Sequence, residues 1–405
     1  MGNSNSSPST ADVTAANPDD AGAGSGRCPS IGGLDDSLVA PMSTTEIHIQ
    51  PTADACQSTP SKQLQATDFD LEVESAMAST TTFPDTGPEP SGRSRRVEDY
   101  YVLESTRLGR GHYATVYRGR SRRTNQPVAI KKIRRALTDE TRLKSEVAAL
   151  RKIQEHPNIV SLLDVFETAG DVYVVMELCT GGELFERLAE KGPYSEMDCV
   201  RHVRCMAEAV AFMHANDIVH RDLKPENILL STPDDTLACI KIADFGLAKI
   251  TTATSMKTKC GTWGYSAPEM ISGSGCTFGY DAKVDSWSLG TILYILLCGF
   301  HPFDPNGTRS DNDMIAAIKK CHFDYADEAW VGISIQAKDL IKHLLVLDPN
   351  ERYSIADVLA HPWITGREGV DIPVQPLSPT IHTDLARFQK TTRAKMYDEV
   401  DENEA

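Results

Sequence analysis

The chain has 405 residues, of which 40% are hydrophobic, and its formal net charge is −16. This length is sufficient for one large domain with tails or for two modest domains. The negative charge disfavours nucleic acid and anionic lipid as general partners, and it is compatible with cationic substrates. The ten cysteines include no Cys-x-x-Cys pair, so we predict neither a zinc site nor a disulfide framework, but reduced thiols in a cytoplasmic protein. No apolar run is long enough to span a bilayer, and no signal peptide is recognisable.

The first 96 residues are rich in Ser, Thr, Ala, Asp and Pro. Such a composition buries too little apolar area to offset the chain entropy, so we predict that residues 1–96 are disordered. The segment begins MGNSNS, which fits the pattern for N-myristoylation of Gly2, although short patterns of this kind also match by chance. One acyl chain binds a membrane only marginally, with a constant on the order of 10⁴ M⁻¹. We therefore expect a cytoplasmic protein with, at most, reversible membrane contact.

Hydrophobic periodicity predicts ordered structure from about Tyr100 onward. Period-two alternation and short apolar runs predict strands at 101–108, 115–120, 128–133, 172–176 and 239–243. Apolar residues at helical spacing predict helices at 141–153, 199–215, 284–298 and 335–347. A strand-rich first part followed by a helix-rich second part predicts an α+β protein with two lobes.

The sequence GRGHYATV, residues 109–116, lies between two predicted strands. Its glycines would let the backbone approach phosphate oxygens, but taken alone it is better explained as a plain β-hairpin turn. The following strand contains Val-Ala-Ile-Lys, which ends at Lys131. A lysine on an interior strand needs anionic partners, because burying an unpaired ammonium is costly, and Glu146 and a phosphate are candidates. The alternative, a strand-edge lysine with a solvated head, suits Lys132.

The sequence HRDLKPEN, residues 220–227, places a carboxylate, a cation and a carboxamide on one short loop. Asp222 can orient a hydroxyl nucleophile and accept its proton, Lys224 can neutralise charge on a transferring group, and Asn227 offers an oxygen to a metal. An Asp-Phe-Gly sequence, which begins at Asp244, follows a predicted buried strand and supplies a second metal-binding group. Phosphoryl transfer needs in-line positioning and cancelled charge, and these residue types supply both.

These motifs, together with Ala-Pro-Glu at 267–269, occur in the order found in the eukaryotic protein kinase family, which the chain resembles from about 101 to 364. The resemblance implies a bilobal α+β protein-kinase fold, with a small antiparallel β lobe and a larger helical lobe. It implies a kinase domain at 100–364, a regulatory tail at 365–405, and ATP and Mg²⁺ as cofactors. Two positions depart from the family pattern: Ala114 replaces the third glycine, and Trp263 stands where relatives usually carry proline.

The resemblance also implies a role for each motif residue. The implied catalytic residues are Asp222 as the base, Lys224 and Lys131, and the implied metal ligands are Asn227 and Asp244. The implied structural pairs are Lys131 with Glu146, Glu269 with Arg352, and Asp285 with the catalytic loop. The implied ATP-binding residues are Leu108, Gly109, Arg110, Gly111, His112, Tyr113, Ala114, Thr115, Val116, Ala129, Lys131, Glu146, Glu177 and Cys179.

Three further segments resemble the calcium/calmodulin-dependent protein kinase group: GGELF at 181–185, TKCGT at 258–262 and HPWI at 361–364. The sequence KPEN in the catalytic loop is typical of serine/threonine rather than tyrosine specificity. By this resemblance, Glu183 and Glu226 receive a basic residue three positions before the phosphoacceptor. Carboxylates in a substrate groove favour arginine through charge-assisted hydrogen bonds. The alternative is that both are ordinary solvated surface charges.

Thr258 matches the activating threonine of this group, which an upstream kinase phosphorylates. A phosphate on this loop would meet the cation of Arg221, which precedes the catalytic aspartate. The alternative is a flexible polar loop.

In the C-terminal tail, Ile381, Leu385, Phe388 and Met396 fall on one helical face, with basic residues around them. The stretch 381–396 resembles the autoinhibitory region of calcium-regulated kinases, which blocks the substrate groove and leaves it for calmodulin. A helix that is simply docked on the lobe is an equal alternative. The chain contains no EF-hand loop, so a calcium response would need a separate sensor.

Two other functions are alternatives to an active, calmodulin-controlled kinase. A pseudokinase scaffold would bind nucleotide or partners without catalysis, but scaffolds typically lose one of the motif residues that are intact here. A checkpoint-type kinase of the same group, without calmodulin control, would fit the insertion at about 272–280. However, the N-terminal segment is too polar and too poor in strands for the phosphopeptide-binding domain expected of such a kinase.

Overall fold

The computed structural model describes residues 95–402, apart from 112–113, 154, 193, 235–237, 246–248, 251–262, 273–281 and 367–371. The described residues belong to one compact unit, which spans residues 79–405. The predicted disordered segment lies outside the described residues except for Arg95 and Arg96, and so do Gly2, Thr258 and two residues of the glycine-rich turn. Within the described residues, no helix combines the length and the apolar character that crossing a bilayer requires.

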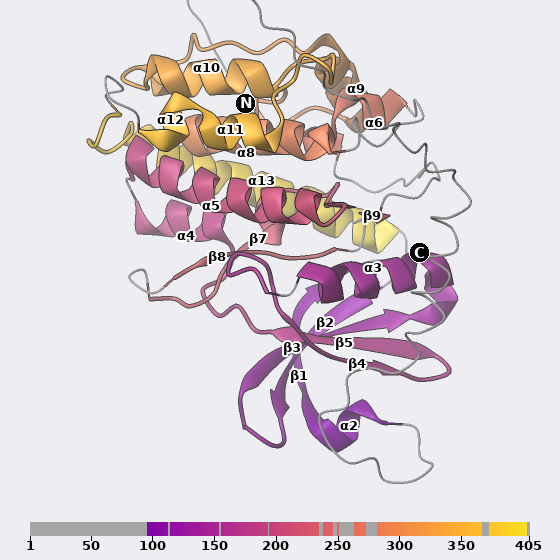
Figure 1. Ribbon diagram of the computed structural model, residues 1–405. Coiled ribbons are helices and arrows are strands. Elements are labelled where there is room, and N and C mark those ends of the chain that lie inside the picture. Colours follow the sequence, from indigo (N-terminus) through magenta and orange to yellow (C-terminus); the bar gives the residue numbers. More distant parts are fainter. Residues whose placement is uncertain are drawn as a thin grey trace, which may run out of the picture. The chain divides into compact units, whose positions relative to one another are not determined.

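An antiparallel sheet forms the first part of this unit, with the strand order β1-β2-β3-β5-β4 (Figure 1). Its strands are β1 (Tyr101–Arg110), β2 (Ala114–Ser121), β3 (Pro127–Arg134), β4 (Leu162–Glu167) and β5 (Asp171–Glu177). Helix α3 (Glu140–Ile153) packs on one face, and the short helix α2 (Val97–Tyr100) lies against the other. Alternate residues of β5 therefore enter two apolar clusters: Val174 joins the α3 side, while Val175 joins the side of Val97.

Helices dominate the second part. They are α4 (Leu184–Lys191), α5 (Glu196–Ala215), α6 (Pro268–Ser272), α8 (Lys283–Cys298), α9 (Asp311–Lys320), α10 (Ile335–Leu344), α11 (Ile355–Ala360), α12 (Pro362–Thr365) and α13 (Thr380–Glu402). Two short antiparallel pairs accompany them: β6 (Ile218–Val219) with β9 (Lys249–Ile250), and β7 (Ile228–Leu230) with β8 (Ile240–Ile242). Helix α8 is buried on all sides from Val284 to Cys298, which explains why its sequence is apolar all round.

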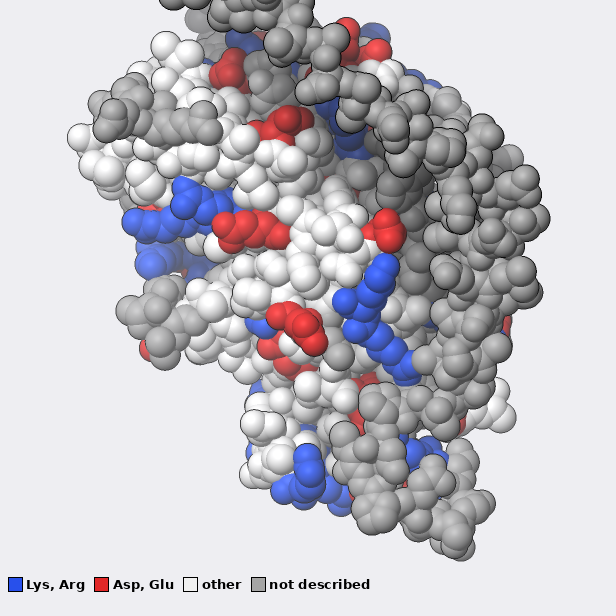
Figure 2. All heavy atoms as spheres, in the orientation of Figure 1, with Lys and Arg blue, Asp and Glu red and all other residues white. Residues whose placement is uncertain are grey.

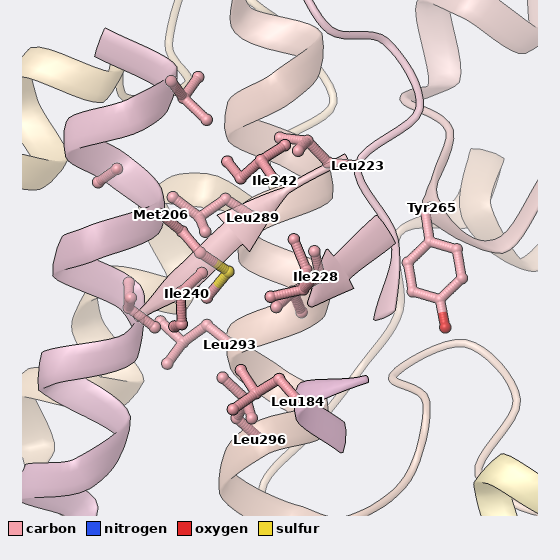
Figure 3. Close-up of a cluster of buried hydrophobic side chains, with 14 of the residues drawn as sticks. Leu184, Met206, Leu223, Ile228, Ile240, Ile242, Tyr265, Leu289, Leu293 and Leu296 are labelled. Atoms are coloured by element: carbon pink, nitrogen blue, oxygen red, sulfur yellow. The ribbon is translucent and has the colours of Figure 1, made fainter. Parts of the chain in front are cut away.

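An aliphatic cluster connects the β7–β8 hairpin to helices α5 and α8 (Figure 3). Ile228 and Ile242 face each other across the hairpin and are fully buried together with Met206, Leu289 and Leu293. A fully buried side chain of this kind stabilises the fold by about 1.5–3 kcal/mol. The cluster therefore holds in place the hairpin whose two flanking loops carry the motif residues.

Helix boundaries differ from the predicted ones where capping chemistry decides them. Helix α5 begins at Glu196, three residues before the predicted start, because Ser195 and Asp198 form a capping box. Helix α10 ends at Leu344 rather than at 347, because the backbone of Leu345 leaves the helical region.

Candidate active site

Lys131 on β3 is the charged centre of the candidate active site. Its Nζ lies 2.6 Å from Glu146 Oε1 on α3 and 2.8 Å from Oδ1 of Asp244, which follows β8. Only 5% of Lys131 and 2% of Glu146 are exposed. A buried ammonium needs opposite charges in good geometry, and here it has two carboxylates. The predicted contact between Lys131 and Glu146 is present, and Lys131 also reaches a predicted metal ligand.

Asp285 on α8 holds the loop that contains Asp222. Its fully buried carboxylate accepts hydrogen bonds from the backbone N–H groups of His220, at 2.9 Å, and Arg221, at 2.8 Å. A third hydrogen bond comes from Nε2 of His214 at 2.8 Å. Burial would raise the pKa of Asp285, but the hydrogen bond from His214 and the neighbouring donors and charges outweigh burial and lower it. Arg221 has a φ of +66°, so Asp285 fixes a strained backbone position.

Asp222 and Lys224 form an ion pair on this loop, with Lys224 Nζ 2.9 Å from Asp222 Oδ2. Burial would lower the pKa of Lys224, but the charges of Asp222, Glu226 and Asp244 outweigh it and raise the pKa. Lys224 therefore stays protonated at neutral pH. The structure thus places a carboxylate and a cation side by side. The sequence had predicted both on one short loop, with Asp222 to orient a hydroxyl and Lys224 to neutralise phosphate charge.

Asn227 and Asp244 emerge from the same end of the β7–β8 hairpin. Ile228 pairs with Ile242, and the N–H of Ala243 donates to the carbonyl of Asn227 at 2.9 Å. Asn227 Nδ2 donates to the carbonyl of Asp222 at 2.8 Å, which leaves the amide oxygen for another partner.

Two hard oxygen donors of this kind fit Mg²⁺, which takes one or two protein oxygens together with substrate phosphates and water. Among the described residues, no group of three or more His, Cys, Asp and Glu side chains could hold a metal by itself. The donor set therefore fits a metal that is bound together with a phosphate ligand.

The loop after β8 is anchored by Phe245 and His220. Phe245 is buried and its ring meets the His220 ring edge-on at 5.0 Å. His220 Nδ1 accepts from the N–H of Asp222 at 3.3 Å, so Nε2 carries the proton and donates to the carbonyl of Ala243 at 3.2 Å. One histidine thus connects the loop of Asp222 to the loop of Asp244.

The glycine-rich turn connects β1 to β2, with Gly109 opposite Val116 and Arg110 opposite Thr115. His112 and Tyr113 lie outside the described residues. A Cβ added at Gly109 would meet no atom within 4 Å, and one at Gly111 would meet only the carbonyl of Ala114 at 3.7 Å. Packing among the described residues therefore does not require glycine at either position.

Of the predicted ATP-binding residues, Glu177 ends β5 and Cys179 lies two positions beyond it. The carboxylate of Glu177 is already engaged, since Lys241 Nζ and the N–H of Ser161 each lie 2.7 Å from Oε1. Burial raises the pKa of Cys179 to about 12, so the thiol is neutral. A contact of either residue with adenine would therefore come from the backbone. The pair of Lys241 and Glu177, which joins β8 to β5, has no motif that would have predicted it.

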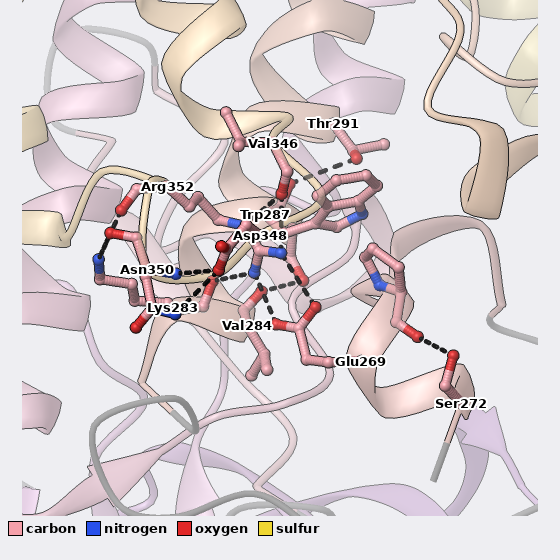
Figure 4. Close-up of polar contacts among 12 residues, drawn as sticks. Glu269, Ser272, Lys283, Val284, Trp287, Thr291, Val346, Asp348, Asn350 and Arg352 are labelled. Atoms are coloured by element: carbon pink, nitrogen blue, oxygen red, sulfur yellow. Dashed lines mark hydrogen bonds and ion pairs between the residues drawn. The ribbon is translucent and has the colours of Figure 1, made fainter. Parts of the chain in front are cut away.

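The predicted pair of Glu269 and Arg352 is present and bidentate, at 2.7 and 2.9 Å (Figure 4). Only 1% of Arg352 is exposed, and its guanidinium lies 5.1 Å from the ring centroid of Trp287. Lys283 Nζ donates to the carbonyl of Arg352 at 2.7 Å. These contacts join α6 to α8 and to the loop before α11.

Glu183 and Glu226, the predicted substrate-recognition residues, come from two segments that pair: the N–H of Leu230 donates to the carbonyl of Gly182 at 2.9 Å. Burial raises the pKa of Tyr265, and the charges of Glu226 and Glu183 raise it further. Glu183 also bridges to Leu229, which follows the catalytic loop in the chain. The structure therefore brings together the segments of two acidic residues that are 43 positions apart in the numbering. The sequence did not point to Tyr265.

The predicted tail helix is present as α13 and packs against α4 and α8 (Figure 1). Ile381 and Leu385 are buried, and Phe388 is half-buried. Gly299 has a φ of +87°, and an added Cβ would lie 2.7 Å from the carbonyl of Ile381, so the helix sits directly on the end of α8. The side chain of Met396 lies outside the described residues.

Acidic and basic side chains of the described residues are interspersed on the face drawn in Figure 2. White surface separates small groups of either sign. In the described part, this face therefore has no extended area of a single charge.

The sequence of this chain matches those of known proteins over most of the described residues. Residues 102–364 match the protein kinase domain family. Rat calcium/calmodulin-dependent protein kinase type IV is 46% identical over 272 residues, which cover 67% of this chain and 55% of that protein. The human type IV kinase is 43% identical over 298 residues, 73% of this chain and 61% of the relative. Myosin light chain kinase A of Dictyostelium discoideum is 44% identical over 272 residues, 66% of this chain and 89% of the relative.

The fold and the linked charged residues are those of the protein kinase class. The chain belongs to the protein kinase family and, within it, to the calcium/calmodulin-dependent protein kinase group. The matched part covers 55 to 64% of the length of the rat, human and mouse type IV relatives.

Proposed function

We propose that this protein transfers the γ-phosphoryl group of Mg-ATP to serine and threonine hydroxyls of other proteins. The observation that carries the proposal is the connected charge set at the two loops. Lys131 contacts Glu146 and Asp244, while Asp222 contacts Lys224. Phosphoryl transfer asks a protein mainly for positioning and charge compensation, and this set supplies both.

Each residue has a distinct task in this proposal. Lys131, held by Glu146, binds the α- and β-phosphates. Asp222 orients the incoming hydroxyl and accepts its proton, and Lys224 stabilises charge on the transferring group. Asn227 and Asp244 would hold Mg²⁺, which when bound neutralises phosphate charge.

Transfer of radiolabelled phosphate from ATP to a serine peptide tests the activity directly. The full chain, first treated with an upstream kinase, should label the peptide, whereas Lys131→Met should not. Lys132→Met is the matched control, because Lys132 pairs with Asp171 on the sheet and does not contact the proposed phosphate site. Equal labelling by the wild type and Lys131→Met would contradict the assignment.

We further propose that the protein prefers arginine three residues before the phosphoacceptor. The pairing of the segments of Glu183 and Glu226 supports this, since a guanidinium forms charge-assisted hydrogen bonds with carboxylates. Replacing that arginine by alanine in the peptide should lower kcat/KM on the order of 10- to 100-fold, the effect expected for a charge-assisted pair worth about 1.5–3 kcal/mol. Glu226→Gln should reduce the penalty, and an unchanged preference in this variant would remove the hypothesis.

Phosphorylation of Thr258 by an upstream kinase is proposed as the activating event. Thr258 lies outside the described residues, and the support is the pairing of β6 with β9, which joins the strand before the catalytic loop to the segment that leads to Thr258. A phosphate there would meet Arg221. Thr258→Ala should therefore be less active than the wild type after treatment with the upstream kinase. Full activity of the variant would refute the proposal.

Autoinhibition by α13, relieved by calmodulin, is proposed as a second control. The support is the contact of α13 with α4, because α4 begins directly after Glu183. Deleting the chain after about residue 369 should raise the basal rate, and calcium-dependent calmodulin pull-down should capture the full chain but not the truncated one. Capture of neither form would favour the alternative, a checkpoint-type kinase without calmodulin control.

N-myristoylation of Gly2 is proposed as a reversible membrane anchor on an otherwise cytoplasmic protein. Its support is the N-terminal sequence alone. Intact-mass measurement of the protein from cells that contain the acyltransferase should show the added acyl chain. An unmodified mass would remove this proposal.

A further inference from the structure

The turn Trp263–Tyr265 carries Tyr265 to the two carboxylates of the proposed arginine site. It is a 3-10 turn of three residues with glycine at its centre, and no proline restricts its backbone. Its own closing bond runs from the N–H of Ser266 to the carbonyl of Trp263 at 3.0 Å. So short a turn depends on contacts from outside for a single conformation.

Two side chains outside the turn bind its carbonyl groups. The hydroxyl of Ser288 on α8 donates to the carbonyl of Tyr265 at 2.8 Å. His301, in the loop after α8, donates from Nε2 to the carbonyl of Gly264 at 3.0 Å. The two bonds fix consecutive peptide groups, so together they set the direction in which the Tyr265 side chain leaves the backbone.

His301 is itself held in one orientation and one tautomer. It is 3% exposed, and its Nδ1 accepts from the N–H of Phe303 at 3.1 Å. Because Nδ1 is the acceptor, Nε2 carries the proton that is donated to Gly264. The ring also meets the Tyr265 ring edge-on, with centroids 5.6 Å apart and planes at 81°.

Gly264 and His301 fit each other closely. A Cβ added at Gly264 would lie 3.0 Å from His301 Nε2, so the imidazole packs directly on the glycine backbone. The hydroxyl of Tyr265, at the far end of its ring, is buried and has no hydrogen-bond partner among the described residues. It is therefore free to bind a group that enters beside Glu183 and Glu226.

We infer that His301 is a positioning residue for substrate selection: it fixes the Trp263–Tyr265 turn and thereby holds the Tyr265 hydroxyl beside the two carboxylates that receive the substrate's arginine. This inference rests on the proposed function and adds a residue that lies outside the motifs named in the sequence analysis. His301 contacts neither substrate nor nucleotide in this account, and it acts through Gly264 and Tyr265.

The test compares His301→Leu with His301→Gln in the full chain, after treatment with the upstream kinase. Leucine keeps much of the volume but removes the donor, while glutamine keeps a donor at a similar reach. His301→Leu should raise the KM for the arginine peptide about five- to tenfold, as expected for one lost hydrogen bond. Its kcat and its KM for ATP should change less than about twofold, and His301→Gln should restore most of the loss.

A matched peptide with alanine in place of the arginine distinguishes the proposed selectivity for arginine from the proposed role of His301. If the wild type prefers the arginine peptide and His301→Leu keeps the same ratio of kcat/KM values, the role of His301 is wrong and the proposed selectivity stands. A uniform fall in kcat for both peptides would also overturn it, because that is what general destabilisation does. If the wild type shows no preference, the proposed selectivity fails and the inference fails with it.

Discussion

Lys131, Asp285 and Arg352 carry charge where almost no water reaches them. Each has opposite charges or several hydrogen bonds around it: Lys131 has two carboxylates, Asp285 has three donors, and Arg352 has a bidentate carboxylate. Removing one partner of a buried pair typically costs about 3–5 kcal/mol, because the other charge stays buried. At the scale of single residues, the proposed catalytic geometry thus depends on buried pairs. Loss of either partner of such a pair lowers the stability of the fold.

Glu146→Gln should lower kcat/KM for ATP on the order of 10- to 100-fold, because a misplacement of Lys131 by about 1 Å is enough for such a loss. The KM for the peptide should change little, since Glu146 contacts Lys131, the proposed phosphate-binding residue. Glu140→Gln on the same helix is the control, because its carboxylate is half exposed and pairs with Arg135 at the surface. Steady-state kinetics with varied ATP measures both. Equal effects of the two substitutions would contradict the role of Glu146.

Asp285 predicts a pH dependence of stability. Its pKa in the folded protein is lowered relative to the unfolded value of about 3.9. A lowered carboxyl pKa contributes stability that is present above the unfolded pKa and is lost as the pH falls through the folded value. Asp285→Asn should therefore be less stable than the wild type at pH 7, and the difference should narrow below about pH 4. Urea unfolding at both pH values measures this, and a difference that is constant with pH would contradict it.

At the scale of elements, periodicity predicted the helices and strands whose packing is simple. The predicted helix at 284–298 is found as α8, Lys283–Cys298, because a helix buried on all sides has an unmistakable apolar run. The strand β4, Leu162–Glu167, was not predicted, because exposed Leu163 interrupts the alternation and Asp164 is held by Arg95 from far away in the chain. Local patterns do not contain such contacts.

In the C-terminal tail, the sequence pattern likewise predicted the helix but not its tertiary contacts. The helical face of Ile381 and Leu385 was readable from the sequence, and both residues are buried. The sequence did not predict which surface the helix covers. That surface includes the end of α8, where Gly299 allows a close approach of the backbone of Ile381. The packing is compatible with autoinhibition and with simple docking, so a measurement has to separate the two.

Leu385→Asp should raise the basal rate severalfold if α13 restrains the enzyme, because a buried carboxylate among apolar side chains would detach the helix. Ala386→Asp is the matched control, since the neighbouring position is exposed on the same helix. Peptide phosphorylation without calcium measures both variants. An unchanged basal rate in Leu385→Asp, with the helix shown to be released by proteolysis, would support simple docking instead.

At the scale of the whole molecule, the motif order predicted the fold class and the residues that meet in the site. The resemblance predicted the contact of Lys131 with Glu146, 15 positions away, but it did not predict the contact of Lys131 with Asp244, 113 positions away. Contacts outside motifs were missed: Lys241 with Glu177 joins β8 to the end of β5, and His301 binds Gly264. Neither Lys241 nor His301 belongs to a recognisable local sequence pattern. These contacts therefore become apparent only in the folded structure.

Asp222 is proposed to orient and deprotonate the incoming hydroxyl while the neighbouring residues hold the phosphate. The most direct test of this role is the rate of phosphate transfer by Asp222→Asn, measured together with Mg-ATP binding. Asp217→Asn is the control, because Asp217 is an exposed residue on the approach to the same loop, and asparagine tolerates its φ of +58°. Asp222→Asn should transfer phosphate on the order of 10²- to 10⁴-fold more slowly while binding Mg-ATP as the wild type does. Transfer by Asp222→Asn at the wild-type rate would contradict the account.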